Sequence, residues 1–263
     1  QSTYRGRWRE MINRSALALK LLTSRKEGAI IAAATFGLPE TRGGERNWDY
    51  RYTWIRDASF TVYAFVRLGF VEEANNFMRW LRGRVGDGCD QPLKLNIMYG
   101  IDGRRELPER ELTHLAGHGG ATPVRVGNGA VDQVQLDIYG ELLDAVYLTN
   151  KYGEAISHEG WQHVTQLVDE VCEVWDQKDV GIWEMRGEKH HFLHSRLMCW
   201  VALDRAIRLA SKRSLPAPFE RWNAARQAIH ADIWDNFWDA ERGHFVQYKG
   251  GTALDGSMLL MPL

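Results

Sequence analysis

Apolar residues recur every three to four positions in several long stretches, and this period constrains the fold more than any other feature of the chain. In 8–23, for example, Ile12, Ala16 and Leu19 follow it. Such spacing places apolar side chains on one face of a helix. The same period predicts further helices at 55–70, 71–85, 131–151, 158–177, 191–211 and 218–238. The chain is therefore predicted to be all-helical, with seven helices.

Strand signals are few by comparison. The apolar run 29–36 is a candidate strand, and a second one comes from the alternation of Leu93, Leu95, Ile97 and Tyr99. The dipeptide Asp102-Gly103 follows it and is typical of a tight turn. Residues 86–130 form a glycine-rich connection of a length that is uncommon unless it is functional or disordered. Strands are expected to be a minor addition to the helices.

The charge and cysteine content exclude several classes of partner. The 33 basic and 34 acidic residues give a net charge of −1 and are scattered without blocks, so neither nucleic acid nor a membrane surface is expected as a partner. No apolar run approaches the ~20 residues of a membrane span. Three cysteines, an odd number without metal-site spacing, favour reduced thiols. A cytoplasmic protein acting on a small or neutral partner is predicted.

Both ends of the chain look like cut points. The sequence starts in polar residues that lead into a helix, and it stops in the apolar run "GSMLLMPL". A helix normally ends in a cap or a polar tail. We therefore expect these residues to be part of a longer protein.

The stretch "ERNWDYRYTWIRDASFT" at 45–61 combines aromatic residues with charged ones. It places Trp48 and Trp54 among charged residues that include Arg56 and Asp57. Because burying a charge without a partner is costly, the mixture indicates a polar site walled by aromatic rings. The alternative is an Arg-Asp pair at a helix N-terminus, where Asp57 only complements the helix dipole.

Two further motifs carry candidate residues. In "GIWEMRG", Trp183 could form an apolar wall that raises the pKa of Glu184, or the pair is a surface turn with the tryptophan tucked inward. In "PVRVGNGAVDQVQLD", Arg125 and Asn128 precede a buried helix, for which Asn128 is a candidate N-cap.

A metal or phosphate site is weakly supported. His190 and His194 lie four apart on a predicted helix, which is a zinc-binding spacing, but no third ligand is evident. The "GHGG" at 117–120 lacks the lysine of a phosphate loop. We therefore expect no metal and no cofactor.

Four long strings together resemble glycoside hydrolase family 15, in its prokaryotic glucoamylase-like and trehalase-like members. They are "RNWDYRYTWIRDASFT", "YGIDGRRELPERELTHLAGHGGATPVRVGNGAVDQVQLDIYGE", "GIWEMRGEKHHFLHSRLMCWVALDRAI" and "GSMLLMPL", and the resemblance runs from about Tyr4 to Leu263. It implies an (α/α)6 toroid that is incomplete at the C-terminal side in this chain. Residues 1–263 would be a partial catalytic domain, with a β-sandwich before it and the remaining helices after it.

The resemblance also implies an activity. It is that of an inverting exo-acting α-glucoside hydrolase that releases β-glucose from nonreducing ends of α-glucans, as a glucoamylase does. Such an enzyme needs two carboxyl groups, an acid and a base. Glu184 matches the family's general acid, and the base would come from a later helix outside this chain. Among the acids after Glu184, Asp204, Glu220, Asp232, Asp235, Asp239 and Glu241 are interpreted as helix-surface or turn residues and Asp255 as a helix-start residue.

The resemblance implies substrate contacts as well. Arg56 and Asp57 match the pair that binds the nonreducing glucose. Further candidate substrate-binding residues are Trp54, Trp183, Trp48, Arg125 and Asn128. Gly181 and Met185 stand where fungal glucoamylases carry an aspartate and a second glutamate, so contacts beyond the first glucose are left open.

Three other functions remain open. Trehalase activity competes with glucoamylase-like activity, because the motifs do not separate the two. A noncatalytic carbohydrate-sensing domain and a phosphorolytic enzyme of the same helical architecture are the others. A ring left open after seven helices would expose apolar flanks, so the isolated segment is expected to aggregate or to form a homo-oligomer.

Overall fold

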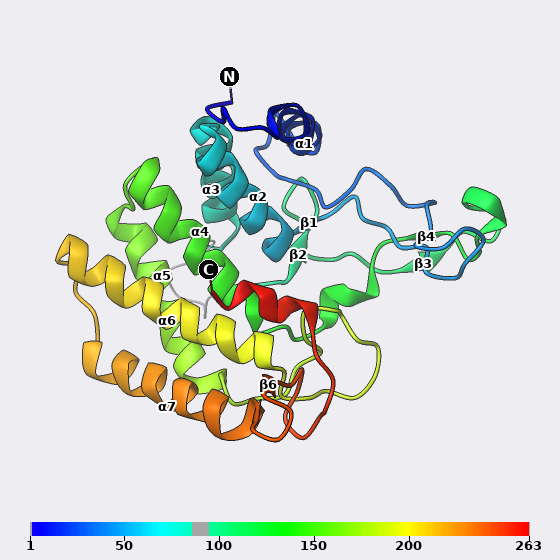
Figure 1. Cartoon of the computed structure of the whole chain (residues 1–263). Helices are drawn as coiled ribbons and strands as arrows, with labels where there is room; N and C mark the ends of the chain where they lie inside the picture. The colour runs from blue at the N-terminus through cyan, green and yellow to red at the C-terminus, as the bar shows by residue number, and fades with distance from the viewer. Residues whose placement is uncertain (1, 86–94, 263) are drawn as a thin grey trace. The chain divides into compact units, whose positions relative to one another are not determined.

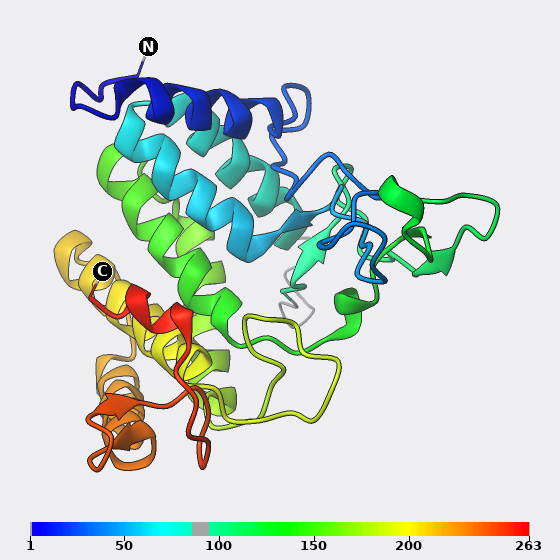
Figure 2. The same ribbon diagram turned by 45° about the vertical axis from the view of Figure 1, so that its right-hand side comes forward.

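The computed structural model describes residues 2–85 and 95–262 of the chain (Figures 1 and 2). The chain divides into two compact units. Unit 1 comprises Gln1–Asp132 with Tyr152–Glu154, and unit 2 comprises Gln133–Lys151 with Ala155–Leu263. Each unit is described by itself below.

The described part of unit 1 contains three α-helices. They are α1 (Arg9–Leu21), α2 (Ile55–Leu68) and α3 (Val71–Val85), and α1 and α3 both pack against α2 (Figure 2). The face of α2 that carries Ala58, Val62 and Phe65 is fully buried. Gly69, in the left-handed region at φ 86°, ends α2 as a C-terminal cap. The helices predicted for this part of the chain are confirmed.

The strands in the described part of the chain are two residues long and form three antiparallel pairs. In unit 1, β1 (Thr53–Trp54) pairs with β2 (Met98–Tyr99), and β3 (Arg110–Glu111) pairs with β4 (Arg125–Val126). In unit 2, β5 (Trp238–Asp239) pairs with β6 (His244–Phe245). Short 3-10 turns are η1 (His118–Gly120), η2 (Gly129–Asp132) and η3 (Gly256–Leu260).

The first predicted strand, 29–36, is wrong. Its backbone forms hydrogen bonds to the aromatic-rich stretch 45–61, with Ala32 N donating to Tyr52 O and Tyr50 N donating to Thr35 O. Bends interrupt these bonds, so no regular ladder forms. An apolar run of this length predicts burial better than it predicts strand geometry.

The second predicted strand is much shorter than its alternation suggested. Leu93 lies outside the described residues, and only Met98 and Tyr99 form β2. Ile97, Met98 and Tyr99 are consecutive and all buried, so this segment has apolar contacts on both faces. The predicted turn is confirmed, because Gly103 has φ 87° and its N–H donates to Gly100 O.

Four helices form most of unit 2. They are α4 (Asp137–Tyr152), α5 (His158–Val174), α6 (Leu193–Arg213) and α7 (Phe219–Phe237). The helices α5, α6 and α7 pack on one another (Figure 1). Gly140 allows α4 to approach α6 closely, because a Cβ at this position would overlap the carbonyl oxygen of Met198. The four helices predicted here are confirmed as elements.

Two of these helices start later than predicted. The helix α4 begins at Asp137 rather than at 131, because 129–132 form the separate turn η2 and Leu136 N donates to the Asp179 carboxylate. The helix α6 begins at Leu193 rather than at 191, because His190 and Phe192 make β-bridges to Asp179 and Tyr248. Hydrogen bonds to other segments of unit 2 therefore hold Leu136, His190 and Phe192 outside the two helices.

Asp204 is not the helix-surface residue that its spacing suggested. It is 2% exposed on α6 and accepts from Arg205 and Arg226, while Arg208 pairs with it at 2.7 Å. Arg226 comes from α7, which covers this part of α6. A buried carboxylate that keeps its charge needs such partners.

No helix in the described part of the chain has the length and hydropathy to cross a membrane. Cys172 and the buried Cys199 are free thiols, and Cys89 lies outside the described residues. Burial raises the pKa of Cys172 to about 11, so this thiol is held in its protonated, unreactive form.

Candidate active site

In the aromatic-rich stretch 45–61, Asp49 and Arg51 form an ion pair. Asp49 is fully buried, and its two carboxylate oxygens accept from Arg51 Nε at 2.8 Å and Nη2 at 2.9 Å. Burial raises the pKa of Asp49, but hydrogen bonds from Arg51 and its positive charge outweigh burial and hold that pKa below its usual value. Arg51 also lies 4.1 Å from the centroid of the Phe36 ring. This part of the predicted polar site is an internal ion pair.

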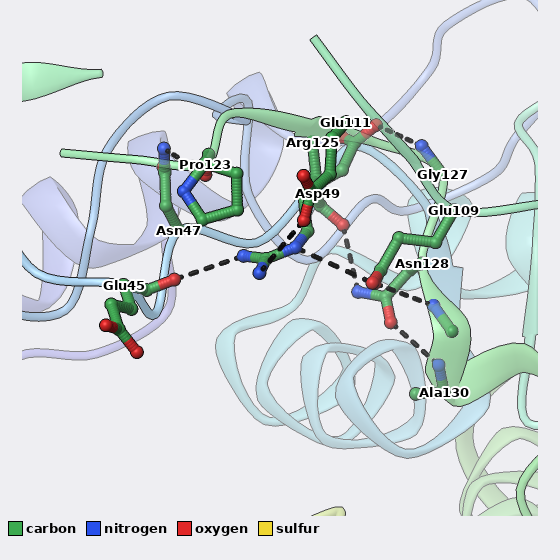
Figure 3. A network of polar contacts seen from close by, with 11 residues as sticks. Glu45, Asn47, Asp49, Glu109, Glu111, Pro123, Arg125, Gly127, Asn128 and Ala130 are labelled. Carbon is green, nitrogen blue, oxygen red and sulfur yellow. Dashed lines mark hydrogen bonds and ion pairs between the residues drawn. The ribbon is translucent and has the colours of Figure 1, made fainter. Parts of the chain in front are cut away.

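The loop at 123–130 is tied to the same stretch by hydrogen bonds (Figure 3). Asn47 Nδ2 donates to Pro123 O, Gly127 N donates to the Asp49 carboxylate, and Asn128 Nδ2 donates to Asp49 O. Gly127 sits at φ 81°, where a Cβ would overlap the Pro108 carbonyl. These hydrogen bonds hold the loop at 123–130 against the stretch that contains Asp49, about 80 residues earlier in the chain.

Several neighbouring groups of unit 1 contact Arg125. Its Nη1 donates to Glu45 O at 3.1 Å, and Glu109 and Glu111 lie 3.6 and 3.8 Å from its nitrogens (Figure 3). The guanidinium also stands 4.7 Å from the centroid of the Trp48 ring. These contacts explain its orientation as part of the loop scaffold, while a role of Arg125 and Trp48 in sugar binding stays a prediction.

Asn128 caps a different element from the one predicted. Its Oδ1 accepts from Ala130 N at 2.9 Å, which caps the short turn η2. The helix α4 starts only at Asp137, so Asn128 is not its N-cap. The prediction of Asn128 as the N-cap of the buried helix is therefore wrong, because the break between η2 and α4 depends on contacts that a single sequence does not reveal.

The predicted glucose-binding residues lie at the start of α2. Arg56 Nε is 3.9 Å from Asp57 Oδ2, and the side chains are 11% and 46% exposed. Asp57 is in the first helical turn, where the helix dipole favours a negative charge. Trp54, directly before α2, is 3% exposed and packs near Tyr50 at 6.0 Å between ring centroids. Asp57 is therefore the accessible member of this group.

Glu184, the predicted acid, ends a tight turn in unit 2. Its N–H donates to Gly181 O at 3.2 Å, and Met185 N donates to Val180 O at 3.3 Å. Glu184 has φ 53°, a left-handed conformation that costs a non-glycine residue about 1–2 kcal/mol. Its carbonyl accepts from Gln133 Nε2 at 3.4 Å. Contacts from outside the turn thus contribute to holding the conformation.

Trp183 points outward. Its side chain is 58% exposed, which contradicts the alternative of a tryptophan tucked into the core. The indole Nε1 donates to Asp255 Oδ2 at 2.8 Å. Asp255 does start η3 as predicted, because its Oδ1 accepts from Ser257 N at 2.8 Å. The bond to Trp183 was not predicted, since the two residues lie 72 positions apart.

Asp179 anchors the loop that contains Glu184. It is fully buried and pairs with His190 through two backbone hydrogen bonds, which close the base of the loop. Its Oδ2 accepts from Leu136 N at 2.9 Å and from Ser195 Oγ at 2.7 Å. Burial raises the pKa of this carboxyl from 3.8 to about 6, against the effect of these hydrogen bonds.

We expect Asp179→Asn to change how stability depends on pH. Because the folded pKa is raised, the unfolded chain loses the proton first, and the wild-type protein loses stability as pH rises from 3.8 to about 6. The amide oxygen can accept the same two hydrogen bonds without carrying a charge. The variant should gain up to about 3 kcal/mol relative to wild type across this window, measured by urea unfolding at several pH values. A difference that stays constant from pH 4 to 7 would contradict the expectation.

The two histidines do not share a helix. His190 precedes α6 and stacks on Tyr248, with 4.4 Å between ring centroids. His194 is buried in α6, and its ring nitrogens lie 3.8 Å from carboxylate oxygens of Asp137 and Glu141 on α4. The prediction of both histidines on one helix is wrong. Within residues 2–85 and 95–262, no group of three or more side chains is arranged to hold a metal ion.

The family model of glycosyl hydrolases family 15 matches residues 6–263, which is nearly the whole chain. The chain belongs to this family. It is 45% identical over 256 residues to a trehalase of Mycobacterium tuberculosis, covering 97% of this chain and 38% of the relative. It is 38% identical over 262 residues to a trehalase of Thermoplasma acidophilum, covering 100% of this chain and 44% of the relative. The chain thus spans less than half the length of these two relatives.

The fold agrees with solved glycosidase structures. A wild-type glycosidase superposes with a TM-score of 0.69 at 21% identity, over 95% of this chain and 62% of that one. At this identity the similarity concerns the fold alone. It confirms the mostly helical fold of the family that the motifs predicted.

Proposed function

We propose that the full-length protein is an inverting α,α-trehalase. The observation that carries this proposal is the identity of 45% and 38% to two trehalases across nearly the whole chain. It favours the trehalase alternative over the glucoamylase-like activity that the motifs suggested first. The full protein would also contain the β-sandwich and the later helices that the family resemblance implies, and with them the general base.

The role proposed for each residue follows from the chemistry of its side chain and from its exposure to solvent. Glu184, half-buried at the end of its turn, would donate a proton to the oxygen that joins the two glucose units. The base would activate water on the opposite face of the ring. Asp57 would accept hydrogen bonds from glucose hydroxyls, and Arg56 beside it would donate several in fixed geometry. Attack on one anomeric carbon releases β-glucose from it and α-glucose as the leaving group.

A substrate comparison on the full-length protein tests the proposal. We expect kcat/KM for trehalose to exceed that for maltose and isomaltose by at least ~10²-fold, because a subsite built to hydrogen-bond one leaving glucose rejects a differently linked one. Proton NMR of the first turnovers of trehalose should show α- and β-glucose in equal amounts.

Three results would count against it. A preference for maltose would instead favour the assignment of glucoamylase-like activity. Release of α-glucose alone would exclude inversion. No turnover of any of the three sugars would favour the noncatalytic carbohydrate-sensing alternative, for which calorimetric binding of glucose would then be the measurement.

A further inference from the structure

We propose that Asp255 is a positioning residue for the acid, and that it acts through Trp183. The inference rests on the proposed function, in which Glu184 is the proton donor. Asp255 accepts the indole N–H of Trp183, the residue immediately before Glu184, at 2.8 Å. All residues in the argument belong to unit 2.

The first step concerns the charge on Asp255. Burial alone would raise the pKa of Asp255, but hydrogen bonds from Ser257, Trp183 and Gln247 outweigh it and hold this pKa below its usual value. The carboxylate is therefore ionised near neutral pH. A hydrogen bond from the Trp183 indole to an anion is about twice as strong as one to a neutral acceptor.

The second step concerns Trp183. Its side chain is 58% exposed, so packing covers less than half of its surface. The contact with Asp255 joins the indole to a group 72 residues away. Fixing the indole in this way limits the movement of the backbone at 183, and hence of the neighbouring Glu184.

The third step concerns the turn itself. Glu184 has φ 53°, and a left-handed non-glycine residue persists only where its surroundings enforce it. Gln133 supplies one contact, to the Glu184 carbonyl at 3.4 Å. The charge-assisted bond between Trp183 and Asp255 is the shorter of these two contacts, and it acts on the adjacent residue. It therefore adds a second contact from outside the turn that helps to place the acid.

The fourth step concerns what holds Asp255. Its Oδ2 also accepts from Gln247 Nε2 at 2.7 Å, and Ala253 O accepts from Gln247 N at 2.9 Å. Gln247 O accepts from Leu193 N, the first residue of α6. Asp255 is thus tied to the start of a long buried helix. A continuous series of hydrogen bonds runs from α6 through Gln247 and Asp255 to Trp183.

The test substitutes Asp255→Ser in the full-length protein. Serine can still cap η3 by accepting from Ser257 N, but it is too short to reach Trp183. If the acid is misplaced, hydrolysis of trehalose should fall by ~10–10²-fold in kcat, with little change in KM. Hydrolysis of α-glucosyl fluoride should fall by less than ~3-fold, because fluoride leaves with little help from an acid. Trp183→Phe, which lacks the N–H, should lower kcat on trehalose by a similar factor, and the double variant should lose no more of this kcat than either single one.

Ser157→Ala is the matched control. Ser157 caps α5 through Gly160 N, so its loss removes a helix cap of unit 2 that has no contact with Trp183. This variant should lower the thermal midpoint and leave kcat on both substrates unchanged. An equal loss of Asp255→Ser on trehalose and on fluoride would show a general structural role and overturn the proposal. Normal turnover of trehalose by Asp255→Ser would also overturn the proposal.

The inference can fail separately from the proposed function. If the wild-type protein cleaves maltose rather than trehalose, the same comparison with the fluoride is made on maltose. If it cleaves neither, the positioning role fails along with the acid assignment. The indole N–H signal of Trp183, assigned in a ¹⁵N-tryptophan spectrum with Trp183→Phe, should move upfield in Asp255→Ser. An unmoved signal would overturn the Trp183–Asp255 link whatever the substrate.

Discussion

Glu184→Gln in the full-length protein is expected to lower the turnover of trehalose by at least ~10²-fold while leaving KM nearly unchanged. Glutamine keeps the size of the side chain and its place at the end of the turn, but it has no proton to give to the leaving oxygen. The measurement is steady-state glucose release over a range of trehalose concentrations. Turnover of α-glucosyl fluoride should be far less affected, because its leaving group needs little protonation.

Glu188→Gln is the control for this prediction. Glu188 lies four residues further along the same loop and is exposed to solvent. The same chemical change there should leave both kcat and KM within about twofold of the wild-type values, as is usual for a surface position. If Glu184→Gln retained near-normal turnover of trehalose, the acid would have to be another residue.

Asp57→Asn should impair binding and turnover together, with a loss of ~10–10²-fold in kcat/KM. An ionised carboxylate accepts hydrogen bonds from two sugar hydroxyls, whereas the amide keeps one acceptor and turns a donor toward the other hydroxyl. The contact exists in both the ground state and the transition state, so KM should rise while kcat falls. Kinetics with trehalose give both constants, and calorimetric binding of glucose gives the ground-state part directly.

Glu72→Gln separates this role from a helix-dipole effect. Glu72 is an exposed acid in the first turn of α3, as Asp57 is in the first turn of α2. Removing either charge should cost a similar 0.3–1 kcal/mol of stability, roughly, if only the dipole matters. Only Asp57→Asn should change the kinetics. Equal and purely structural effects of the two substitutions would favour the alternative in which Asp57 serves only the helix.

Local patterns in the sequence determined the helices and the family. The apolar period predicted α2, α3, α5 and α7 to within three residues at each end, because such a helix needs only its own residues to define a buried face. The strings around Arg56–Asp57 and Glu184 indicated glycoside hydrolase family 15, and the match over residues 6–263 confirms it. The turn at Gly103 and the cap at Asp255 are likewise local, since each bonds to residues within three positions.

Only the tertiary structure decided which polar residues are buried and what they bind. Asp204 follows a helical period that fits a surface, yet packing of α7 on α6 buries it among arginines. Asp255 caps its own turn and also binds Trp183, 72 residues away. Hydrogen bonds between residues far apart in the sequence depend on how the helices pack together. The spacing of residues in a sequence does not predict them. A polar side chain inside a fold must find its partners there, because leaving it without them is costly.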